Sequence, residues 1–558
     1  MVDEELTYRS RILNTIHEAL ENDRADDAVE VEKFNYEQEF DKHLTIMSML
    51  GLGFGLMSPP LSLGVTMGSS LIDGGPLTIM GGYTIVYVCS FFCALSLAEI
   101  TSKYPTELHS GAALIAHPDY SLICSWFTGF FLLIGNWLTS TSITFAGAQI
   151  ILSTVGIVDS KYEIDSVLTV IMFYLVVTYL EFINKLCVYW IVYSILFIDI
   201  LLLIFSRNHH SLKYVFTHFD NSFSGWPSGM AFIIGFQQAN FMLQGFGLLP
   251  SVSDEVQDAE RTVSRGIVLS VLLAGGAGFI FLIPILAVLP DVNLLIGEKT
   301  HGIVPIVLIF KLATRSVIVS FFLVILIIGN LLFSGIGSIA TSSRAVFSMS
   351  RDGALPFADI WTHVHADSES KVPKNSVMLS MAISYLLGLL ALVSSTAFNA
   401  FVGAAVISLC AASLIPIVSL LLGARKKVRG AAFKLKYVGF IINIISTLWL
   451  TFTIFVLSLP PQLPVTASSM NYASLVFLLF VLIITILWFV WGRHNFHGPL
   501  VDKGVSERSD SLPMQTMTSE GYQKLNEPNV SNRENVTSSD IKSTTEAVQM
   551  TVQPSYDI

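Results

Sequence analysis

Charged side chains are scarce in this sequence: Asp, Glu, Lys and Arg together make up only 13% of its 558 residues. A soluble domain carries about 25% charged residues, so this low share argues against a soluble protein. Hydrophobic residues make up 53%, and the mean hydropathy is +0.65. The net charge of −11 arises in two polar tails and does not indicate a cationic partner, and no nucleic-acid partner is expected. The composition therefore predicts an integral membrane protein.

Cysteine is also rare, and no pattern typical of an enzyme is present. The five cysteines all lie in apolar runs without metal-ligand spacing, so we expect small buried side chains and no metal site. These are Cys89, Cys93, Cys124, Cys187 and Cys410. No nucleophile–base arrangement stands out either, so we expect neither an enzyme nor a bound cofactor. The first residues are acidic and polar, so no cleavable signal peptide is expected.

Long apolar runs, in contrast, are abundant. A membrane-spanning helix needs about 20 predominantly apolar residues. Twelve segments qualify, near 44–71, 76–100, 122–154, 166–184, 186–206, 228–251, 266–290, 317–343, 375–394, 398–423, 438–459 and 472–491. We predict an all-α integral membrane protein in which residues 44–492 form a transporter domain of twelve transmembrane helices. An N-terminal tail, 1–43, and a C-terminal tail, 493–558, flank it.

The distribution of basic residues predicts the orientation of the spans. An even number of spans places both tails on one side, and Lys and Arg are enriched in cytoplasmic loops. The loop at 425–436 has the largest basic cluster, and it faces the cytoplasm only if both tails do. The C-terminal tail is rich in Ser, Thr and Asn, which predicts disorder. Whether its serines form a phosphorylation switch stays open.

The first span contains residues that are unfavourable in a helix. Residues 51–68 read GLGFGLMSPPLSLGVTMG, with five glycines and the pair Pro59 and Pro60. The sixth span has Gly245, Gly247 and Pro250 at its centre and cytoplasmic half. Secondary transporters have such interruptions at matching positions of two inverted repeats, where freed backbone groups bind the substrate. The alternative is that Gly and Pro are frequent in membrane helices as packing positions or kinks.

Several motifs resemble the fungal amino acid/choline permeases of the amino acid–polyamine–organocation superfamily. They include SLAEITSKYPT (96–106), SSRAVFSMSRDGALPF (342–357), SSTAFNAFVG (394–403) and LPPQLPVTASSMNYA (459–473). The resemblance covers roughly residues 40–492. It implies a leucine-transporter-like fold with a 5+5 inverted repeat plus two helices, and uptake driven by protons. The substrate would lie between spans one and six, facing spans three, eight and ten.

The sequence departs from the pattern of this family in two places. Glu107, Leu108 and His109 follow TSKYPT, where the family usually has Ala-Gly-Gly. In span six the family commonly has an Asp and, four residues later, a His, and the corresponding residues here are Gly247 and Ser251. The substrate of any one family member therefore cannot be carried over directly.

The substrate-binding candidates are polar, small or backbone-exposing residues of the interrupted spans and their neighbours. They are Met57, Ser58, Pro59 and Ser62 in span one, Asn136 in span three, Gln237, Asn240, Gln244, Gly245, Phe246 and Gly247 in span six, and Asn330 and Ser334 in span eight. A half-helix N-terminus near Pro59 would suit a carboxylate. Amides in lipid are costly, so those of span six should face the bundle interior. The alternative roles are a proline kink and hydrogen bonds between helices.

Asp199 lies within the apolar run IVYSILFIDILLLIF of span five. A carboxylate inside the membrane indicates a functional site by default. It is a candidate for binding and releasing the coupling proton, or for balancing a cationic substrate. The alternative is a structural pair with Arg207 or a hydroxyl group near the outer end of the span.

The sequence predicts a secondary active transporter for a small nitrogenous metabolite such as an amino acid, γ-aminobutyrate or choline. The resemblance implies a proton symporter, and sodium coupling and facilitated diffusion stay open. Thiamine, a polyamine and a biotin precursor are alternative substrates, and a transporter-like nutrient receptor is an alternative function. Membrane lipid is an expected partner, and the oligomeric state stays open. We expect the plasma membrane, with the vacuolar and endoplasmic reticulum membranes as alternatives.

The predicted topology has a direct test. Because both tails are expected in the cytoplasm, a tag fused to either end should be protected from added protease in intact cells. Permeabilising the plasma membrane should make both tags accessible. Cleavage of either tag before permeabilisation would contradict the orientation.

Overall fold

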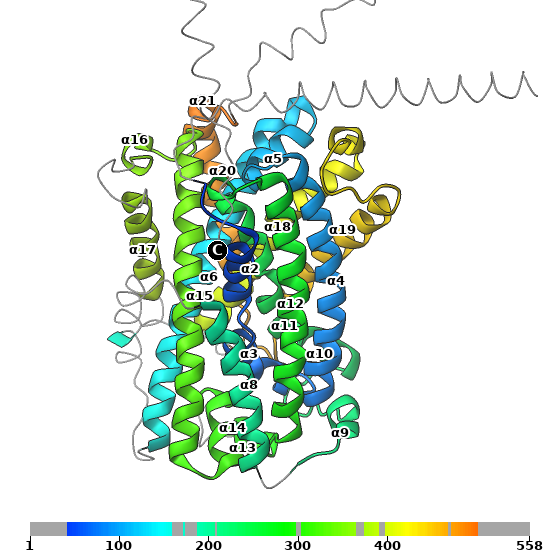
Figure 1. The fold of residues 1–558 in the computed structure, drawn as a ribbon, viewed down its shortest axis with the longest axis vertical. Coiled ribbons are helices and arrows are strands. Elements are labelled where there is room, and N and C mark those ends of the chain that lie inside the picture. The colour runs from blue at the N-terminus through cyan, green and yellow to red at the C-terminus, as the bar shows by residue number, and fades with distance from the viewer. Residues whose placement is uncertain are drawn as a thin grey trace, which may run out of the picture. The chain divides into compact units, whose positions relative to one another are not determined.

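The computed structural model describes residues 42–158, 171–172, 187–206, 209–296, 303–363, 373–389, 397–466 and 470–499. These residues form a bundle of helices, and their only β-structure consists of isolated bridges (Figure 1). Most of the predicted span at 166–184 and most of both predicted tails lie outside the described residues.

The first half of the described chain contains the two interrupted spans. Its helices are α2 (Ile46–Met57), α3 (Pro59–Ile72), α4 (Gly75–Lys103), α5 (Leu108–Ile115), η1 (Pro118–Tyr120), α6 (Ser121–Val158), α8 (Cys187–Phe205), α9 (Leu212–Thr217), α10 (Ser228–Ile234), α11 (Gln237–Leu243), the 3-10 helix η3 (Gln244–Glu255) and α12 (Ala259–Ala287). The second half contains α13 (Val292–Ile296), α14 (Pro305–Thr314), α15 (Val317–Arg351), α16 (Ala358–Trp361), α17 (Lys374–Gly388), α18 (Ala397–Leu421), η6 (Ala424–Val428), α19 (Val438–Val456), α20 (Ala473–Leu487), the π-helix η7 (Trp488–Gly492) and α21 (Arg493–Asn495).

Within the described residues, eight helical segments are long and apolar enough to cross a membrane. They are Ile46–Ile72, Gly75–Lys103, Pro118–Gly156, Ala259–Ala287, Val317–Arg351, Phe398–Leu421, Val438–Val456 and Ala473–Asn495. The predicted spans five and nine appear as the shorter helices α8 and α17, and span six is divided among α10, α11 and η3.

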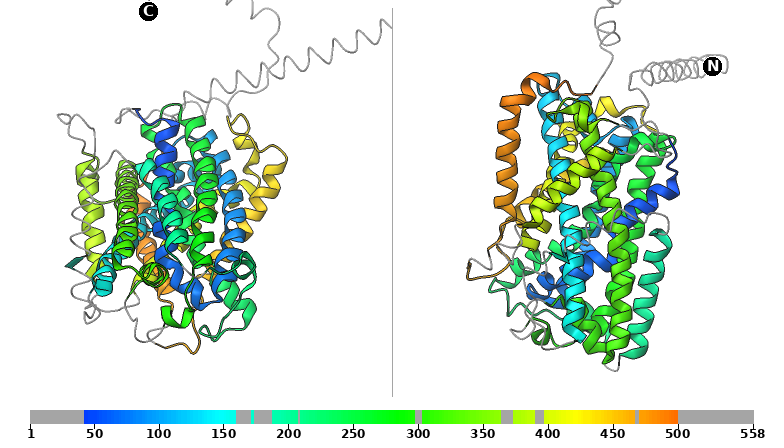
Figure 2. Two further views of the ribbon diagram at one scale, coloured as in Figure 1. Left: turned by 60° about the horizontal axis from the view of Figure 1, so that its bottom comes forward. Right: turned by 90° about the vertical axis from the view of Figure 1, so that its left-hand side faces the viewer.

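Large apolar side chains are exposed along the outer helices of the bundle. On α8 they include Leu196, Phe197 and Ile200, and on α20 only Ala473 and Ile484 are buried. Figure 2 shows α20, in orange, at the edge of the bundle. Exposed apolar surface of this extent is unfavourable in water and favourable against lipid. The chain is an integral, multi-pass membrane protein.

The interrupted first span lies inside the bundle. Helix α2 packs against α12 and α15, and α3 packs against α11 and α4. Figure 1 places α5, α16 and α21 at one end of the bundle and α9, α13 and α14 at the other. We call the end where α2 begins the α2 side, and the end where α3 finishes the α3 side.

The basic loop that predicted the orientation also has structural contacts. Lys427 donates hydrogen bonds from Nζ to the carbonyl oxygens of Leu114, Ile115 and Ala116, at 2.9–3.2 Å, where α5 ends. A cation is favourable there because the last carbonyls of a helix have no partner within it. Arg425 pairs with Glu99 of α4 at 3.2 Å. The loop therefore fastens α5 and α4 on the α2 side.

Candidate functional site

The first span is interrupted at one residue, Ser58. Helix α2 ends at Met57, α3 starts at Pro59, and Ser58 between them has φ 17° and ψ 88°. Proline has no N–H and its ring clashes with the preceding turn, so Pro59 and Pro60 cannot continue α2 but fit the first positions of a new helix. The predicted interruption is present in the structure, and its cause is local in sequence.

The sixth span is interrupted beside the first. Helix α11 ends at Leu243, and the chain continues as the 3-10 helix η3 through Gly245 and Gly247. A Cβ atom on Gly245 would lie 3.0 Å from Met57 Cγ and 3.5 Å from the carbonyl carbon of Leu56. Glycine at 245 therefore allows η3 to approach the end of α2 closely.

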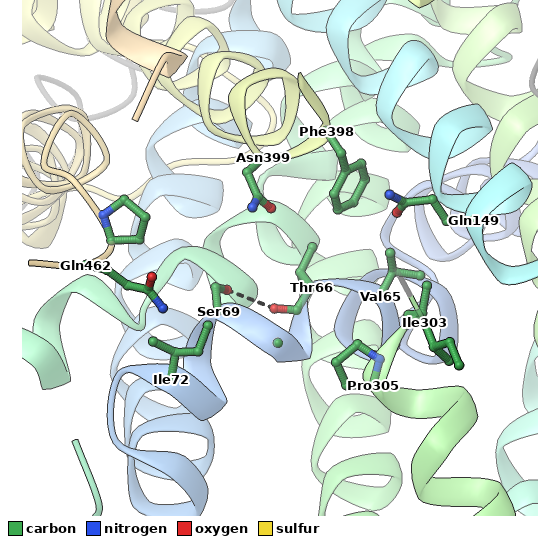
Figure 3. Close-up of a pocket in the computed structure, with 13 residues that line it drawn as sticks. Val65, Thr66, Ser69, Ile72, Gln149, Ile303, Pro305, Phe398, Asn399 and Gln462 are labelled. Atoms are coloured by element: carbon green, nitrogen blue, oxygen red, sulfur yellow. Dashed lines mark hydrogen bonds between the residues drawn. The ribbon is translucent and has the colours of Figure 1, made fainter. Parts of the chain in front are cut away.

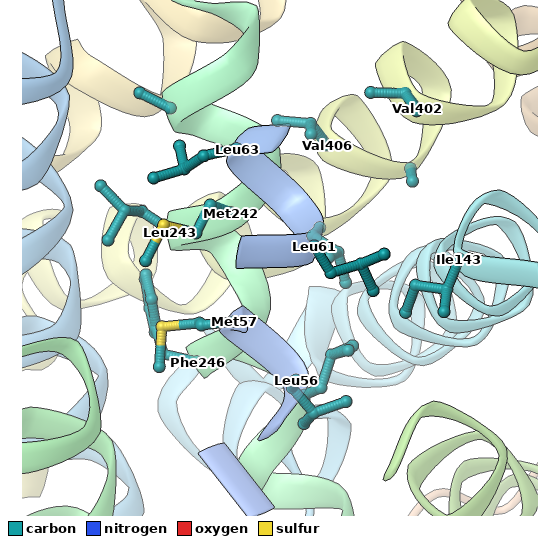
Figure 4. Packing of buried hydrophobic residues seen from close by; sticks show 14 of the residues in the cluster. Leu56, Met57, Leu61, Leu63, Ile143, Met242, Leu243, Phe246, Val402 and Val406 are labelled. Atoms are coloured by element: carbon teal, nitrogen blue, oxygen red, sulfur yellow. The ribbon is translucent and has the colours of Figure 1, made fainter. Parts of the chain in front are cut away.

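A small cavity lies beside the two interruptions. Its volume is ≈ 10 Å³, room for about one water molecule. It is lined by Leu56, Ser62, Thr139, Ile143, Phe241, Gly245, Val406 and Leu409. Figure 4 shows apolar side chains of α3, α6, η3 and α18 packed around the break, including Leu61, Ile143, Phe246 and Val406. In this conformation the centre of the bundle is closed.

A chain of hydrogen bonds connects the break to spans five and eight. Ser58 Oγ donates to Asn330 Oδ1 of α15 at 3.4 Å. Asn330 Nδ2 donates in turn to Ser194 Oγ of α8 and to the carbonyl oxygen of Leu326, both at 2.7 Å. Two of the predicted residues, Ser58 and Asn330, therefore meet. Ser194 was not predicted, because one polar residue in an apolar helix gives no indication of its partner.

Asn136 of α6 and Ser334 of α15 make different contacts. Asn136 Oδ1 accepts a hydrogen bond from Thr341 Oγ1 at 2.9 Å, which joins α6 to α15. The Asn136 Nδ2 atom and the Ser334 hydroxyl are buried without a hydrogen-bond partner. The Asn136 Nδ2 group and the Ser334 hydroxyl can therefore still form hydrogen bonds inside the bundle.

The amides of span six divide into two groups. Gln237 is half-buried, whereas Gln238 is buried and donates from Nε2 to the carbonyl oxygen of Leu63 at 2.7 Å. Gln238, which the sequence analysis did not select, thus joins α11 to α3. Asn240 donates to the carbonyl oxygen of Phe236 at 3.1 Å, and its Oδ1 has no partner. Both polar atoms of the buried Gln244 side chain are also without partners.

Asp199 lies on the inward stripe of α8. The residues Ile191, Ser194, Ile195, Ile198 and Leu202 are buried, and Asp199 is 6% exposed among them. Neither of its carboxylate oxygens has a hydrogen-bond partner. Since a helix rises 1.5 Å per residue, Asp199 is about 7.5 Å along α8 from Ser194, toward the α3 side. Arg207, its predicted alternative partner, lies outside the described residues.

Ion pairs close the bundle on the α2 side. Arg344 Nε contacts Glu255 Oε1 at 2.7 Å, and Arg351 Nη1 contacts Asp254 Oδ2 at 3.0 Å, so that α15 holds the end of η3. The main-chain N–H of Leu44, just before α2, donates to the carbonyl oxygen of Glu255 at 3.0 Å. The start of span one is thus fastened to the ends of spans six and eight.

Glu107 and His109, which depart from the family pattern, also contact the end of α15 on the α2 side. His109 Nε2 lies 2.8 Å from Asp352 Oδ2, and its Nδ1 lies 3.7 Å from Glu107 Oε2. Burial, and then the nearby negative charge of Asp254, raise the pKa of the Glu107 carboxyl well above its usual value. The departure from the family pattern therefore creates a buried polar cluster where α5 meets the end of α15.

The α3 side has a vestibule of ≈ 310 Å³. Its described lining is Val65, Thr66, Gly68, Ser69, Ile72, Gln149, Ile303, Val304, Pro305, Phe398, Asn399, Pro461 and Gln462, without a charged side chain among them. Figure 3 shows the polar side chains of Gln149, Asn399 and Gln462 around the same space as Thr66 and Ser69.

Apolar helices that cross a membrane, two of them interrupted beside a buried cavity, define the class of multi-pass membrane transporters. Residues 43–499 match the family model of the amino acid permeases, and the chain belongs to that family. The predicted family is thereby confirmed. The chain is a transporter that moves a small molecule across a membrane, and not an enzyme.

The names of the relatives of this chain indicate different substrates. The polyamine transporter TPO5 of Saccharomyces cerevisiae is 52% identical over 88% of this chain and 82% of its own length. The choline transporter of the same yeast is 28% identical over 82% of each chain. The amino-acid permease BAT1 of Arabidopsis thaliana is 29% identical over 85% of this chain and 96% of its own length.

The contact at Gly245 predicts a sharp difference between two glycines. Gly245→Leu should abolish uptake while the protein still reaches its membrane, because the new side chain would collide with Met57 and fill the cavity. Gly276→Leu, in α12, is the matched control and should retain uptake, since no atom lies within 4 Å of a Cβ placed there. Unchanged uptake in Gly245→Leu would exclude this part of span six from the site.

The Arg344–Glu255 pair predicts a loss of stability. Arg344 and Glu255 are 17% and 6% exposed, so Arg344→Gln leaves a nearly buried carboxylate without its partner. The expected cost is about 2 kcal/mol in the free energy of unfolding, below that of a fully buried pair. It should appear as a lower thermal midpoint in detergent. Arg265→Gln, at an exposed arginine of α12, should have no effect, and adding Glu255→Gln to Arg344→Gln should recover part of the loss.

Proposed function

We propose that this permease takes up a polyamine, or a related small organic cation with several amino groups, and that protons drive the uptake. The substrate would bind between the interrupted spans one and six, beside Ser58, Ser62 and Gly245. The 52% identity to a polyamine transporter supports this substrate class, and the charges of the described core support it independently.

The proposal rests mainly on which charged side chains are buried in the described part of the bundle: carboxylates are, and Lys and Arg side chains are not. Among the described residues, no Lys or Arg side chain is buried, whereas Asp199 is buried without a partner. A substrate carboxylate would meet no compensating cation in such a core. An ammonium group would meet no like charge there, and the Asn240 Oδ1 and Gln244 Oε1 atoms, which have no hydrogen-bond partner, can accept its N–H groups. The same balance favours a cation over an amino acid or γ-aminobutyrate.

The N-terminus of α3 supports the same assignment. A half-helix N-terminus binds carboxylates through its free N–H groups. The first two residues of α3 are Pro59 and Pro60, and neither has an N–H. The break that was expected to suit a carboxylate therefore has fewer donors, while the carbonyl groups at the end of α2 remain available to a cation.

The vestibule would face the outside of the cell. The difference between the two ends of the bundle, a vestibule on the α3 side and ion pairs on the α2 side, supports this orientation. In the proposed topology of twelve spans, with a 5+5 inverted repeat and both tails in the cytoplasm, the α3 side faces outward, and the plasma membrane is the proposed location. The neutral vestibule would receive substrate from outside, and the ion pairs of Arg344 and Arg351 would close the cytoplasmic path. Release would then require these pairs to separate.

Uptake of labelled substrates tests the proposal. Cells that express the chain should accumulate labelled spermidine, and an uncoupler should prevent the accumulation. An excess of unlabelled putrescine should compete, whereas γ-aminobutyrate at the same concentration should not. Accumulation that survives the uncoupler would contradict proton coupling, and effective competition by γ-aminobutyrate would contradict the cation assignment.

Asp199→Asn distinguishes the possible roles of this carboxylate. The amide keeps the shape of the side chain but cannot cycle a proton, so we expect exchange of labelled for unlabelled substrate without accumulation against a gradient. Loss of both activities would instead indicate that Asp199 balances the substrate charge. Survival of both would show a structural role. Asp291→Asn, at an exposed carboxylate on the α3 side, is the matched control and should retain both activities.

A further inference from the structure

Asp73 is a second buried carboxylate, in the short connection between α3 and α4. It is 1% exposed, and neither of its carboxylate oxygens has a hydrogen-bond partner. Its surroundings are formed by three elements. Thr78 of α4 donates to the Asp73 carbonyl oxygen at 3.3 Å, and a Cβ atom on Gly235, between α10 and α11, would lie 3.3 Å from Asp73 Cβ.

The position of Asp73 is unfavourable for a negative charge in two ways. Burial removes its carboxylate from water. Asp73 is also the C-cap residue of the 14-residue helix α3, where the helix dipole already presents partial negative charge. Burial raises the pKa of Asp73 to about 8. In this closed arrangement the carboxyl is therefore protonated at neutral pH.

The surface that buries Asp73 lies between parts of spans one and six. Ser70 Oγ of α3 donates to the carbonyl oxygen of Gly235 at 2.7 Å, at the point where α10 ends. Ser69 and Ile72, on the same last turns of α3, line the vestibule. Separation of α3 from the α10–α11 connection would expose Asp73 on the α3 side, next to the turns of α3 that line the vestibule.

No charged neighbour explains the state of this carboxyl. Helices α3, α10 and α11 and the first two turns of α4 contain no titratable side chain. His218 and Asp220 lie on the segment that packs over Gly74, where Asp220 N donates to the Gly74 carbonyl oxygen at 3.3 Å. Burial alone raises the pKa of Asp73, whereas hydrogen bonds from Ser222 lower the pKa of Asp220. The two carboxyls therefore differ in environment although they are close in space.

We propose that Asp73 is a proton-binding site of the outer gate, which takes up one proton from the α3 side when α3 closes against the α10–α11 connection. The proton passes from vestibule water to the carboxylate, and reopening returns it to water. Proton-driven uptake, as proposed above, gives this step its role: closure over the substrate would be favoured where the outside is acidic. The site is separate from Asp199, which lies on α8.

The sign of the pH dependence follows from the two states of the gate. The Asp73 carboxyl has a pKa of about 8 when buried and an ordinary pKa near 4 when exposed to water. The protonated carboxyl therefore stabilises the closed gate, fully below about pH 4, and this contribution is lost as the pH rises toward 8. Between these values the ratio of closed to open gates falls by up to tenfold for each pH unit.

Cysteine accessibility measures the gate without any transported substrate. Ser70→Cys places a thiol at the buried contact with Gly235, and Ser222→Cys places one on the exposed outer segment. Both are labelled in intact cells with a membrane-impermeant thiol reagent, and labelling of the parent chain is subtracted. The ratio of the two rates cancels the effect of pH on thiol reactivity and corrects for expression.

From pH 6 to pH 8, we expect the ratio for Ser70→Cys to rise by tenfold or more. Asp73→Asn, in the same background, should keep it low at every pH, because the amide is always neutral. Asp73→Glu should restore the pH dependence. Asp220→Asn should not alter the rise of the Ser70→Cys rate, which is compared there without the reference thiol because Asp220 contacts residue 222. An equal rise in Asp73→Asn would overturn the proposal, and so would a flat ratio with Asp73 intact. Since no substrate is added, these outcomes are independent of whether the chain carries polyamines.

Discussion

The missing N–H groups of Pro59 and Pro60 end helix α2 at Met57, and most of the site depends on that interruption. A continuous helix would fill the centre of the bundle and satisfy its own backbone. Instead the chain turns at Ser58, whose hydroxyl joins α15, while Gly245 allows η3 to approach the end of α2. The same two prolines remove donors from the start of α3. One local feature therefore sets both the position of the break and the number of N–H donors beside it.

The two sides of the bundle are closed by different chemistry. On the α2 side the contacts are ion pairs between α15 and η3. On the α3 side the contacts are hydrogen bonds and a carboxyl group without a partner. The energy of this second closure depends on protonation, whereas that of the first depends mainly on geometry. A transporter that opens its sides alternately needs two closures that respond to different conditions.

The sequence predicts those features whose cause is local. The interruptions at Ser58 and Gly245 follow from proline and glycine chemistry, and the apolar runs follow from the lipid environment. Contacts between distant segments are harder to predict from the sequence. Ser194 and Asn330, for example, are 136 residues apart and meet only in the folded bundle. Gln238 rather than Gln237 contacts α3 because a shift of one residue rotates a side chain by about 100° around a helix. Asp73 escaped notice because an acidic residue at the end of a span is normally solvated.

The main-chain pairing on the α2 side has a mechanical consequence. His43 N and Leu44 N both donate to the Glu255 carbonyl oxygen, and Gln257 N donates to that of Leu44, each at 3.0 Å. The polypeptide before α2 is thereby attached directly to the end of span six, close to the Arg344 ion pair. Any force or binding partner that displaces the chain at His43 would strain these hydrogen bonds to the end of span six. Opening toward the α2 side therefore has to break these main-chain hydrogen bonds as well as the Arg344–Glu255 ion pair.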